Sequence, residues 1–231
     1  MRLLTLFDID GTLVNTGGAG RRAMARAFEA TLGIVGVLDH VPLAGRTDEA
    51  IIGDVLARSG ASAWAGNGWR RTFEARYFAC LDEELSRGAD EARTVLPGVV
   101  PLVDALAARP GVALALLTGN FRESAEIKLG HFDLWRRFAF GAFGGETVSR
   151  DDLLPIALRH AAEHGLPPFA PHEVVIVGDT VHDVVCARSG SVRCLAVATG
   201  GTTADALRDA GADLVVGDLS DTAAILDWLL R

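Results

Sequence analysis

Residues 3–12 read LLTLFDIDGT, a short apolar run that ends in two acids and a tight turn. Such a run is typical of a strand buried on both faces of a sheet. Asp8 and Asp10 follow at its carboxyl end, and Gly11 and Thr12 turn the chain directly after them. A carboxylate placed there can attack phosphorus while its neighbour protonates the leaving oxygen and later activates water. The other interpretation is a plain acidic turn, in which Asp and Gly serve the backbone conformation.

Five more apolar runs end in Gly, Thr or Asp, and helical patterns lie between them. With residues 3–10, the predicted strands are 112–120, 138–145, 174–180, 194–201 and 214–218. The predicted helices are 101–109, 121–131, 151–164, 181–189 and 203–211. This alternation predicts an α/β fold with a doubly wound, Rossmann-like parallel sheet, whose reactive crevice lies beyond the carboxyl ends of its strands.

A long insertion interrupts this pattern after the first strand. About 100 residues separate the first two strands, whereas a crossover with its helix needs only ~12. Apolar residues within the insertion recur every four positions, at Met24, Phe28 and Leu32 and again at Trp69, Phe73, Tyr77, Leu81 and Leu85. This spacing predicts amphipathic helices packed together. We therefore expect a core domain of residues 1–14 and 96–231 and a helical cap domain of residues 15–95, with hinges at 15–18 and 88–98, where glycines permit motion.

Two further strand ends carry polar residues that suit a phosphate and a metal. The run 112–120 ends in Thr118, Gly119 and Asn120, where a hydroxyl and backbone N–H groups can hold phosphate oxygens. The run 174–180 contains Asp179, and Asp183 follows four residues later. Asp8, Asp179 and Asp183, with a backbone carbonyl and waters, offer the all-oxygen ligand set that Mg²⁺ prefers.

These motifs, in this order, resemble those of the haloacid dehalogenase superfamily, and in particular its capped phosphatases of the phosphoglycolate-phosphatase type. The matching residues are the DxDGT motif at 8–12, Thr118, and the GDxxxD motif at 178–183. The resemblance implies that Asp8 is the nucleophile and Asp10 the acid and base. It also implies that Asp8, the Asp10 carbonyl and Asp179 bind Mg²⁺, with Asp183 as a further candidate. Gly11, Thr12, Gly119 and Asn120 are then expected to contact the substrate.

The cation of the third motif departs from the superfamily pattern. Relatives generally carry a Lys before the helix that precedes the fourth strand, whereas Arg150 stands there in this chain. Arg keeps the positive charge and can bind phosphate through two N–H groups, so we favour Arg150. The alternative for Arg150 is a surface residue paired with Asp151 or Asp152.

Lys128 is the competing cation, because it is the single Lys among 22 basic residues. It lies eight residues beyond Asn120, a rise of about 12 Å along a helix, which is a long reach for one side chain.

A loop within the insertion is the best candidate for a substrate contact from the cap. Residues 42–48 read PLAGRTD and join two helical segments. Arg46 can bind an anion, and Thr47 or Asp48 can cap the following helix. The other interpretation is an ordinary helix cap with an exposed Arg46.

Several activities compete with a phosphatase that hydrolyses a small phosphate ester. Dehalogenases of the superfamily lack the second acid of the first motif, and its phosphonate hydrolases need a cap Lys, which residues 16–95 do not contain. A sugar phosphomutase would use the same motifs and differ in how well the closed cap excludes water. A phospho-accepting signalling domain is the alternative without turnover, although it would be shorter and have no helical insertion.

Composition narrows the partners and the compartment. The 22 basic and 30 acidic residues give a net charge of −8, which disfavours nucleic acid. The longest stretch without a charged residue has 12 residues, from Pro110 to Phe121, too few for the ~20 that cross a bilayer. Asp8 and Asp10 interrupt the apolar run that a secretory signal needs, so we expect a cytoplasmic protein. The expected partner is a small phosphate ester, and the sequence leaves the oligomeric state open.

Overall fold

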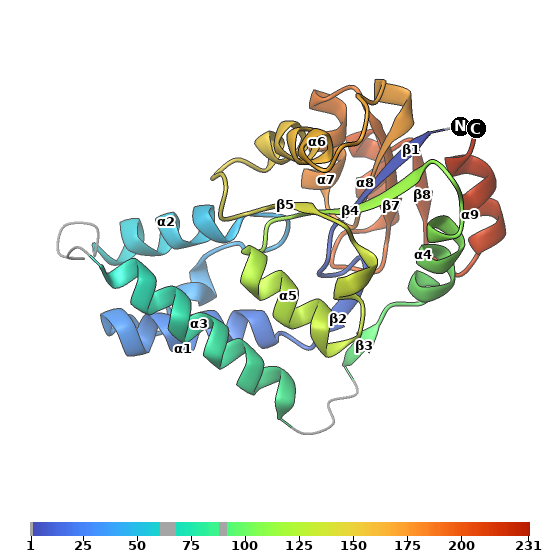
Figure 1. The fold of residues 1–231 in the computed structure, drawn as a ribbon. Coiled ribbons are helices and arrows are strands. Elements are labelled where there is room, and N and C mark those ends of the chain that lie inside the picture. Colours follow the sequence, from blue (N-terminus) through green and yellow to red (C-terminus); the bar gives the residue numbers. More distant parts are fainter. Residues whose placement is uncertain (1, 61–67, 88–91) are drawn as a thin grey trace.

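The core of the fold is a six-stranded parallel sheet, seen in a computed structural model that describes residues 2–60, 68–87 and 92–231 (Figure 1). The strand order is β5-β4-β1-β6-β7-β8, and every pair in it is parallel. The strands are β1 (Leu3–Phe7), β4 (Val112–Thr118), β5 (Gly141–Phe143), β6 (Val174–Gly178), β7 (Arg193–Val197) and β8 (Leu214–Val216). The prediction of a doubly wound parallel sheet is confirmed.

Strand β1 occupies the centre of this sheet and therefore positions the first acidic motif. It pairs with β4 on one side and β6 on the other, and all five of its residues are buried. Alternate side chains enter opposite cores: Leu4 and Leu6 pack into one hydrophobic cluster, and Leu3 and Phe7 into the other. The strand order reverses at β1, which is the place where open α/β sheets form their crevice.

Helices cover both faces of the sheet. Those on the face of Leu3 and Phe7 are α4 (Val99–Ala107), α5 (Arg122–His131) and α9 (Thr222–Leu229). Those on the face of Leu4 and Leu6 are α6 (Leu153–Glu163), α7 (Val181–Ser189) and α8 (Ala204–Ala210). Both faces are thus closed to water, which explains why the strands read as continuous apolar runs.

The insertion folds into helices with a hydrophobic cluster of their own. These are α1 (Ala19–Leu32), the short η1 (Val37–His40), α2 (Asp48–Ser59) and α3 (Trp69–Ser86). Phe28, Phe73 and Tyr77 are almost fully buried there, and Figure 1 shows the three long helices grouped at one end of the molecule. The helices predicted from the four-residue spacing are present. The domain boundaries themselves stay a prediction.

The two crossings between the sheet and these helices are paired with each other. Strand β2 (Val14–Thr16) and strand β3 (Arg93–Val95) form a two-stranded antiparallel ribbon. Part of the second expected hinge, 88–91, lies outside the described residues.

The predicted strand 138–145 is shorter in the structure, where only β5 forms. Among the described residues, none of the helices has the length and apolar character of a membrane span.

Candidate active site

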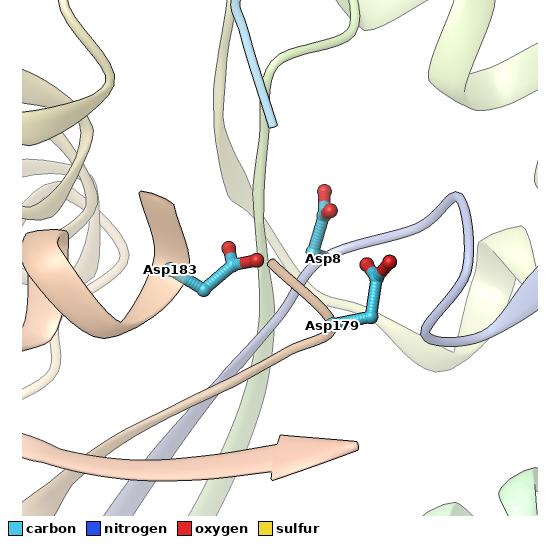
Figure 2. Close-up of side chains that lie close together, drawn as sticks. All are labelled: Asp8, Asp179 and Asp183. Carbon is cyan, nitrogen blue, oxygen red and sulfur yellow. The ribbon is translucent and has the colours of Figure 1, made fainter. Parts of the chain in front are cut away.

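Three carboxylates meet at the carboxyl ends of β1 and β6. Asp8 follows β1, Asp179 follows β6, and Asp183 lies in the first turn of α7. Their ligand oxygens lie within 4.8 Å of one another, and all three residues are buried. Figure 2 shows the three side chains gathered around one space. The sequence prediction that strand ends bring these acids together is confirmed in its geometry.

Burial and mutual repulsion make this cluster costly to ionise. Burial is the main cause that raises the pKa of Asp8 to about 6, with Arg150 opposing the shift and Asp183 and Asp10 adding to it. Burial likewise raises the pKa of Asp179 to about 8, and the charges of Asp8 and Asp183 contribute. A divalent cation would relieve both effects, and a set of carboxylate oxygens is the chemistry that a hard cation requires. The residues present therefore fit a divalent metal ion.

Arg150 is a buried partner of this cluster. It begins the short η4 helix (Arg150–Asp152) and is only 7% exposed. One of its N–H groups donates to Asp183, and the same nitrogen lies 3.2 Å from Asp8. Burial by itself would lower the pKa of Arg150, but the carboxylates of Asp183 and Asp8 outweigh it and raise that pKa. The alternative of a surface Arg paired with Asp151 or Asp152 is wrong, because η4 packs against α7 and turns the guanidinium inward.

Lys128 reaches the site as well, on the side of Asp10. Its Nζ lies 2.6 Å from the Asp10 carboxylate and 2.6 Å from the side-chain oxygen of Asn120. The long reach expected for Lys128 is bridged for two reasons. Side chains on a helix lean toward its N-terminus, and Gly20 of α1 leaves room, since a Cβ there would lie 3.2 Å from Nζ. The two candidate cations thus hold different acids.

Asn120 links the end of β4 to Asp10. Its side-chain N–H groups donate to the Asp10 carboxylate at 2.9 Å and to the Thr118 hydroxyl oxygen at 2.8 Å. The backbone N–H of Asn120 also donates to that hydroxyl, at 3.3 Å. The Thr118 oxygen therefore accepts, which leaves its own hydrogen for a ligand oxygen.

Gly11 and Thr12 turn the chain beside Asp179. Gly11 has φ +80°, and a Cβ on it would lie 2.5 Å from the Asp179 carboxylate, so this close approach requires glycine. The Thr12 hydroxyl, 1% exposed, donates to the same carboxylate at 3.2 Å. The structure thus places Thr12 behind Asp179, and its predicted contact with substrate stays a prediction.

The loop before α2 docks onto the ends of the core strands. The backbone N–H of Asp48 donates to the Gly119 carbonyl at 2.7 Å, and the Asp48 carboxylate accepts from the N–H of Phe121 at 2.9 Å. Arg150 donates to the Gly45 carbonyl at 3.3 Å. Thr47 caps α2, as predicted, and its side chain accepts from Ala50. The helical insertion therefore closes over the acidic centre.

A cavity of about 510 Å³ lies between this loop, the helices of the insertion and the acidic centre. Asp8, Asp10 and Asp179 lie at the sheet end, and Met24, Leu43, Ile51 and Tyr77 come from the insertion. Arg46 also lines the cavity, although its guanidinium donates to Asp54 at 2.7 Å. A small ligand with one polar end fits such a space.

A family comparison agrees with this geometry. Residues 4–190 match the model of the haloacid dehalogenase-like hydrolases. The chain belongs to this family.

Individual relatives of this hydrolase are distant but cover nearly its whole length. It is 27% identical to phosphoglycolate phosphatase 1 of Pseudomonas aeruginosa, over 97% of this chain and 79% of that protein. A hydrolase from Pseudomonas syringae has a similar fold, with a TM-score of 0.69, 21% identity and 99% of each chain covered. CbbY from Rhodobacter sphaeroides, solved in complex with phosphate, gives a TM-score of 0.66 at 22% identity over 96% of each chain.

Several residues of this site have no role among those predicted from the sequence. Thr180 donates its hydroxyl hydrogen to Asp183 at 2.7 Å and caps α7. The T-x-x-D spacing of a capping box is the sequence signal that predicts this cap. Gly200 also approaches the site, since a Cβ there would lie 1.7 Å from the Asp179 carboxylate. Asp48, considered only as a helix cap, and Tyr77, considered only as a core residue, line the cavity without any sequence signal for it.

Proposed function

We propose that this hydrolase is a phosphatase that cleaves phosphate monoesters of small molecules through a phosphorylated Asp8. The supporting observation is that Asp8 lines the cavity together with Asp10 and lies 3.2 Å from the guanidinium of Arg150. This arrangement supplies a nucleophile, a second carboxyl group for proton transfer and a cation for phosphate oxygens.

The first half of the reaction transfers the phosphoryl group to the protein. A carboxylate oxygen of Asp8 attacks phosphorus, and the bond from phosphorus to the ester oxygen breaks. The carboxyl group of Asp10 gives its proton to the departing oxygen, so that a neutral alcohol leaves. Thr118 and Arg150 hold phosphoryl oxygens through their O–H and N–H hydrogens during this transfer.

The second half returns the free enzyme. Asp10, now a carboxylate, takes a proton from water, and the water oxygen attacks phosphorus of the phosphorylated Asp8. Inorganic phosphate leaves, Asp8 regains its carboxylate, and the proton stays on Asp10 for the next turnover. Lys128 and Asn120 hold the Asp10 side chain in place for both proton transfers.

Asp8, Asp179, the Asp10 carbonyl and Asp183 would hold the divalent metal, which we propose is Mg²⁺. When bound, the ion supplies positive charge that offsets the charge of the phosphate and of the clustered acids. Carboxylate and carbonyl oxygens are the hard ligands that Mg²⁺ prefers.

The substrate range follows from the cavity and from the relatives. The phosphatase of Pseudomonas aeruginosa at 27% identity is a phosphoglycolate phosphatase. We propose a substrate of this size class, either phosphoglycolate-like or a sugar phosphate.

The test of this function is release of inorganic phosphate from a panel of phosphorylated metabolites with Mg²⁺. We expect multiple turnovers in the wild type and at least ~100-fold slower turnover in Asp8→Asn, because an amide cannot serve as the nucleophile. Asp205→Asn, at a 90% exposed side chain, is the matched control and should keep wild-type activity. Steady hydrolysis by Asp8→Asn would remove Asp8 from the nucleophilic role.

The same experiment separates the competing functions. A phosphomutase would pass the phosphoryl group to a second hydroxyl and release little phosphate, because its closed cap would have to exclude water from phosphorylated Asp8. A signalling domain would stay phosphorylated on Asp8 without turnover.

A further inference from the structure

The cations around the cavity already have carboxylate partners. Among the described residues that line it, the ion pairs are Arg21 with Asp39, Arg46 with Asp54, Lys128 with Asp10, and Arg150 with Asp8. Two of these cations, Lys128 and Arg150, belong to the catalytic end. A second anionic group on the substrate would therefore have to pair with Arg21 or Arg46.

Both of these arginines already donate hydrogen bonds to several acceptors of the protein. Arg46 donates to Asp54 at 2.7 Å and to the carbonyls of Pro42 and Ala50 at 3.3 and 3.4 Å. Arg21 donates to Asp39 at 2.7 Å and to the Leu38 carbonyl at 3.2 Å. An incoming carboxylate would therefore compete with Asp39 or Asp54 for the charge of either guanidinium.

Asp48 adds a negative charge to the lining of the cavity. Asp48 is 6% exposed and lines the cavity. Its Oδ2 atom accepts hydrogen bonds from the Phe121 N–H and the Ser124 hydroxyl. The other carboxylate oxygen, Oδ1, accepts no hydrogen bond from the described residues. The lining residues Met24, Leu43 and Ile51 are apolar and offer this carboxylate no donor.

We propose that the alcohol part of the substrate is uncharged and carries hydroxyl groups, as in a sugar or polyol monophosphate, and that Asp48 selects against a second anionic group. This inference rests on the proposed phosphatase function. A hydroxyl donates to a carboxylate, whereas a carboxylate beside Asp48 loses its water and meets a like charge. Selection then comes from repulsion of the wrong substrate as well as from attraction of the right one.

The test compares two esters that differ only at this group, 2-hydroxyethyl phosphate and 2-phosphoglycolate. We expect wild-type kcat/KM to be at least ~10-fold higher for the uncharged ester. In Asp48→Asn the ratio should fall toward one, because the amide oxygen still accepts from Phe121 while the charge is gone. Asp54→Asn releases Arg46 from its carboxylate and should also favour 2-phosphoglycolate. Asp205→Asn, at an exposed side chain that does not line the cavity, should keep the wild-type ratio.

Each outcome decides a separate claim. A wild-type preference for 2-phosphoglycolate overturns the inference, and so does a ratio that stays unchanged in both Asp48→Asn and Asp54→Asn. Failure of the wild type to release phosphate from either ester, and from p-nitrophenyl phosphate with Mg²⁺ present, contradicts the phosphatase function itself.

Discussion

Arg150 and Lys128 are both buried cations, yet they contact different carboxylates. Arg150 lies against Asp8 and Asp183, and Lys128 lies against Asp10. A planar guanidinium can bridge two acids and a phosphate, while an ammonium fits the narrow space beside Gly20. The proposed nucleophile and the proposed acid therefore each have their own cation.

Asp10→Asn should slow hydrolysis of an alkyl phosphate by about 10²–10⁴-fold, the range for loss of general acid and base catalysis. An aryl phosphate should lose less, because a phenolate leaves without a proton. Measuring kcat for both esters checks this expectation. Equal losses on the two esters would remove Asp10 from the acid role.

Replacing each cation by Met should give two distinguishable kinetic patterns. Lys128→Met should reproduce the Asp10 pattern, with alkyl phosphates more affected than aryl phosphates, because Lys128 holds the Asp10 carboxylate at 2.6 Å. Arg150→Met should lower kcat for both esters alike, by about 10²–10³-fold, because a group that stabilises the transferring phosphoryl is lost.

Conservative variants provide the control for these two changes. Arg150→Lys should recover part of the activity by restoring the charge. Lys128→Arg should recover little, because the Nζ of Lys128 already lies 2.6 Å from Asp10 and from Asn120, and a larger guanidinium would displace both. If Lys128→Met affected both esters equally and Arg150→Met were near wild type, the assigned roles would be reversed.

At the scale of elements, the loop of residues 43–48 joins the helical insertion to the start of α5. Phe121 precedes this helix, and its apolar side chain cannot accept a hydrogen bond from the first turn. The carboxylate of Asp48 accepts from its N–H instead, which places a negative charge at the positive end of the helix. Because α5 also carries Lys128, this contact couples the position of the loop to the proposed acid.

Gly119→Ala should disrupt that docking without changing any charge. A Cβ at position 119 would lie 2.1 Å from the Arg46 carbonyl oxygen, so the loop must move. A displacement of ~1 Å at an active site can cost about 10²-fold in rate, and we expect a loss of this size in kcat/KM. Steady-state kinetics on one alkyl phosphate measures it.

Gly53→Ala is the matched control, in α2 of the same insertion. A Cβ there meets nothing within 4 Å. Alanine should stabilise the helix by about 0.5–1 kcal/mol and leave kcat/KM unchanged. Equal kinetic effects of the two variants would show that docking of the loop at Gly119 is unimportant.

At the scale of the whole molecule, the acidic centre links stability to pH and to metal. Asp8 and Asp179 have folded-state pKa values of about 6 and about 8, above their ordinary value of 3.8. An acid with a raised pKa contributes stability that is fully present below pH 3.8 and is lost as the pH rises through its folded value. The metal-free protein therefore loses stability from these two groups between about pH 4 and pH 8.

Addition of Mg²⁺ should raise Tm more at pH 8 than at pH 5, because the ion binds the ionised acids of the folded state. Asp179→Asn in EDTA should melt above the wild type, by a margin that grows over the same pH range. For a chain of this length each kcal/mol shifts Tm by about 2–4 °C. Calorimetry in EDTA and in Mg²⁺ tests this, with Asp205→Asn as the control. A Tm that Mg²⁺ leaves unchanged at pH 8 would contradict the metal site.

The sheet, the helical insertion and the acidic centre could all be predicted from short patterns in the sequence. Apolar runs such as residues 3–7 predict strands because both faces of a parallel sheet are buried, and the four-residue spacing in 69–85 predicts a helix because 3.6 residues make one turn. Asp8, Asp179 and Thr118 were predictable as neighbours, since parallel strands in one sheet end at the same edge.

The tertiary structure alone decided which side chains complete that centre. Lys128 on α5 and Gly20 on α1 are more than 100 positions apart in the chain, and their contact depends on how these two helices pack. The docking of Asp48 at Phe121 likewise depends on where the insertion meets the core. Local propensity acts over a few residues, whereas these contacts come from the packing of whole elements, which no short pattern in the sequence encodes.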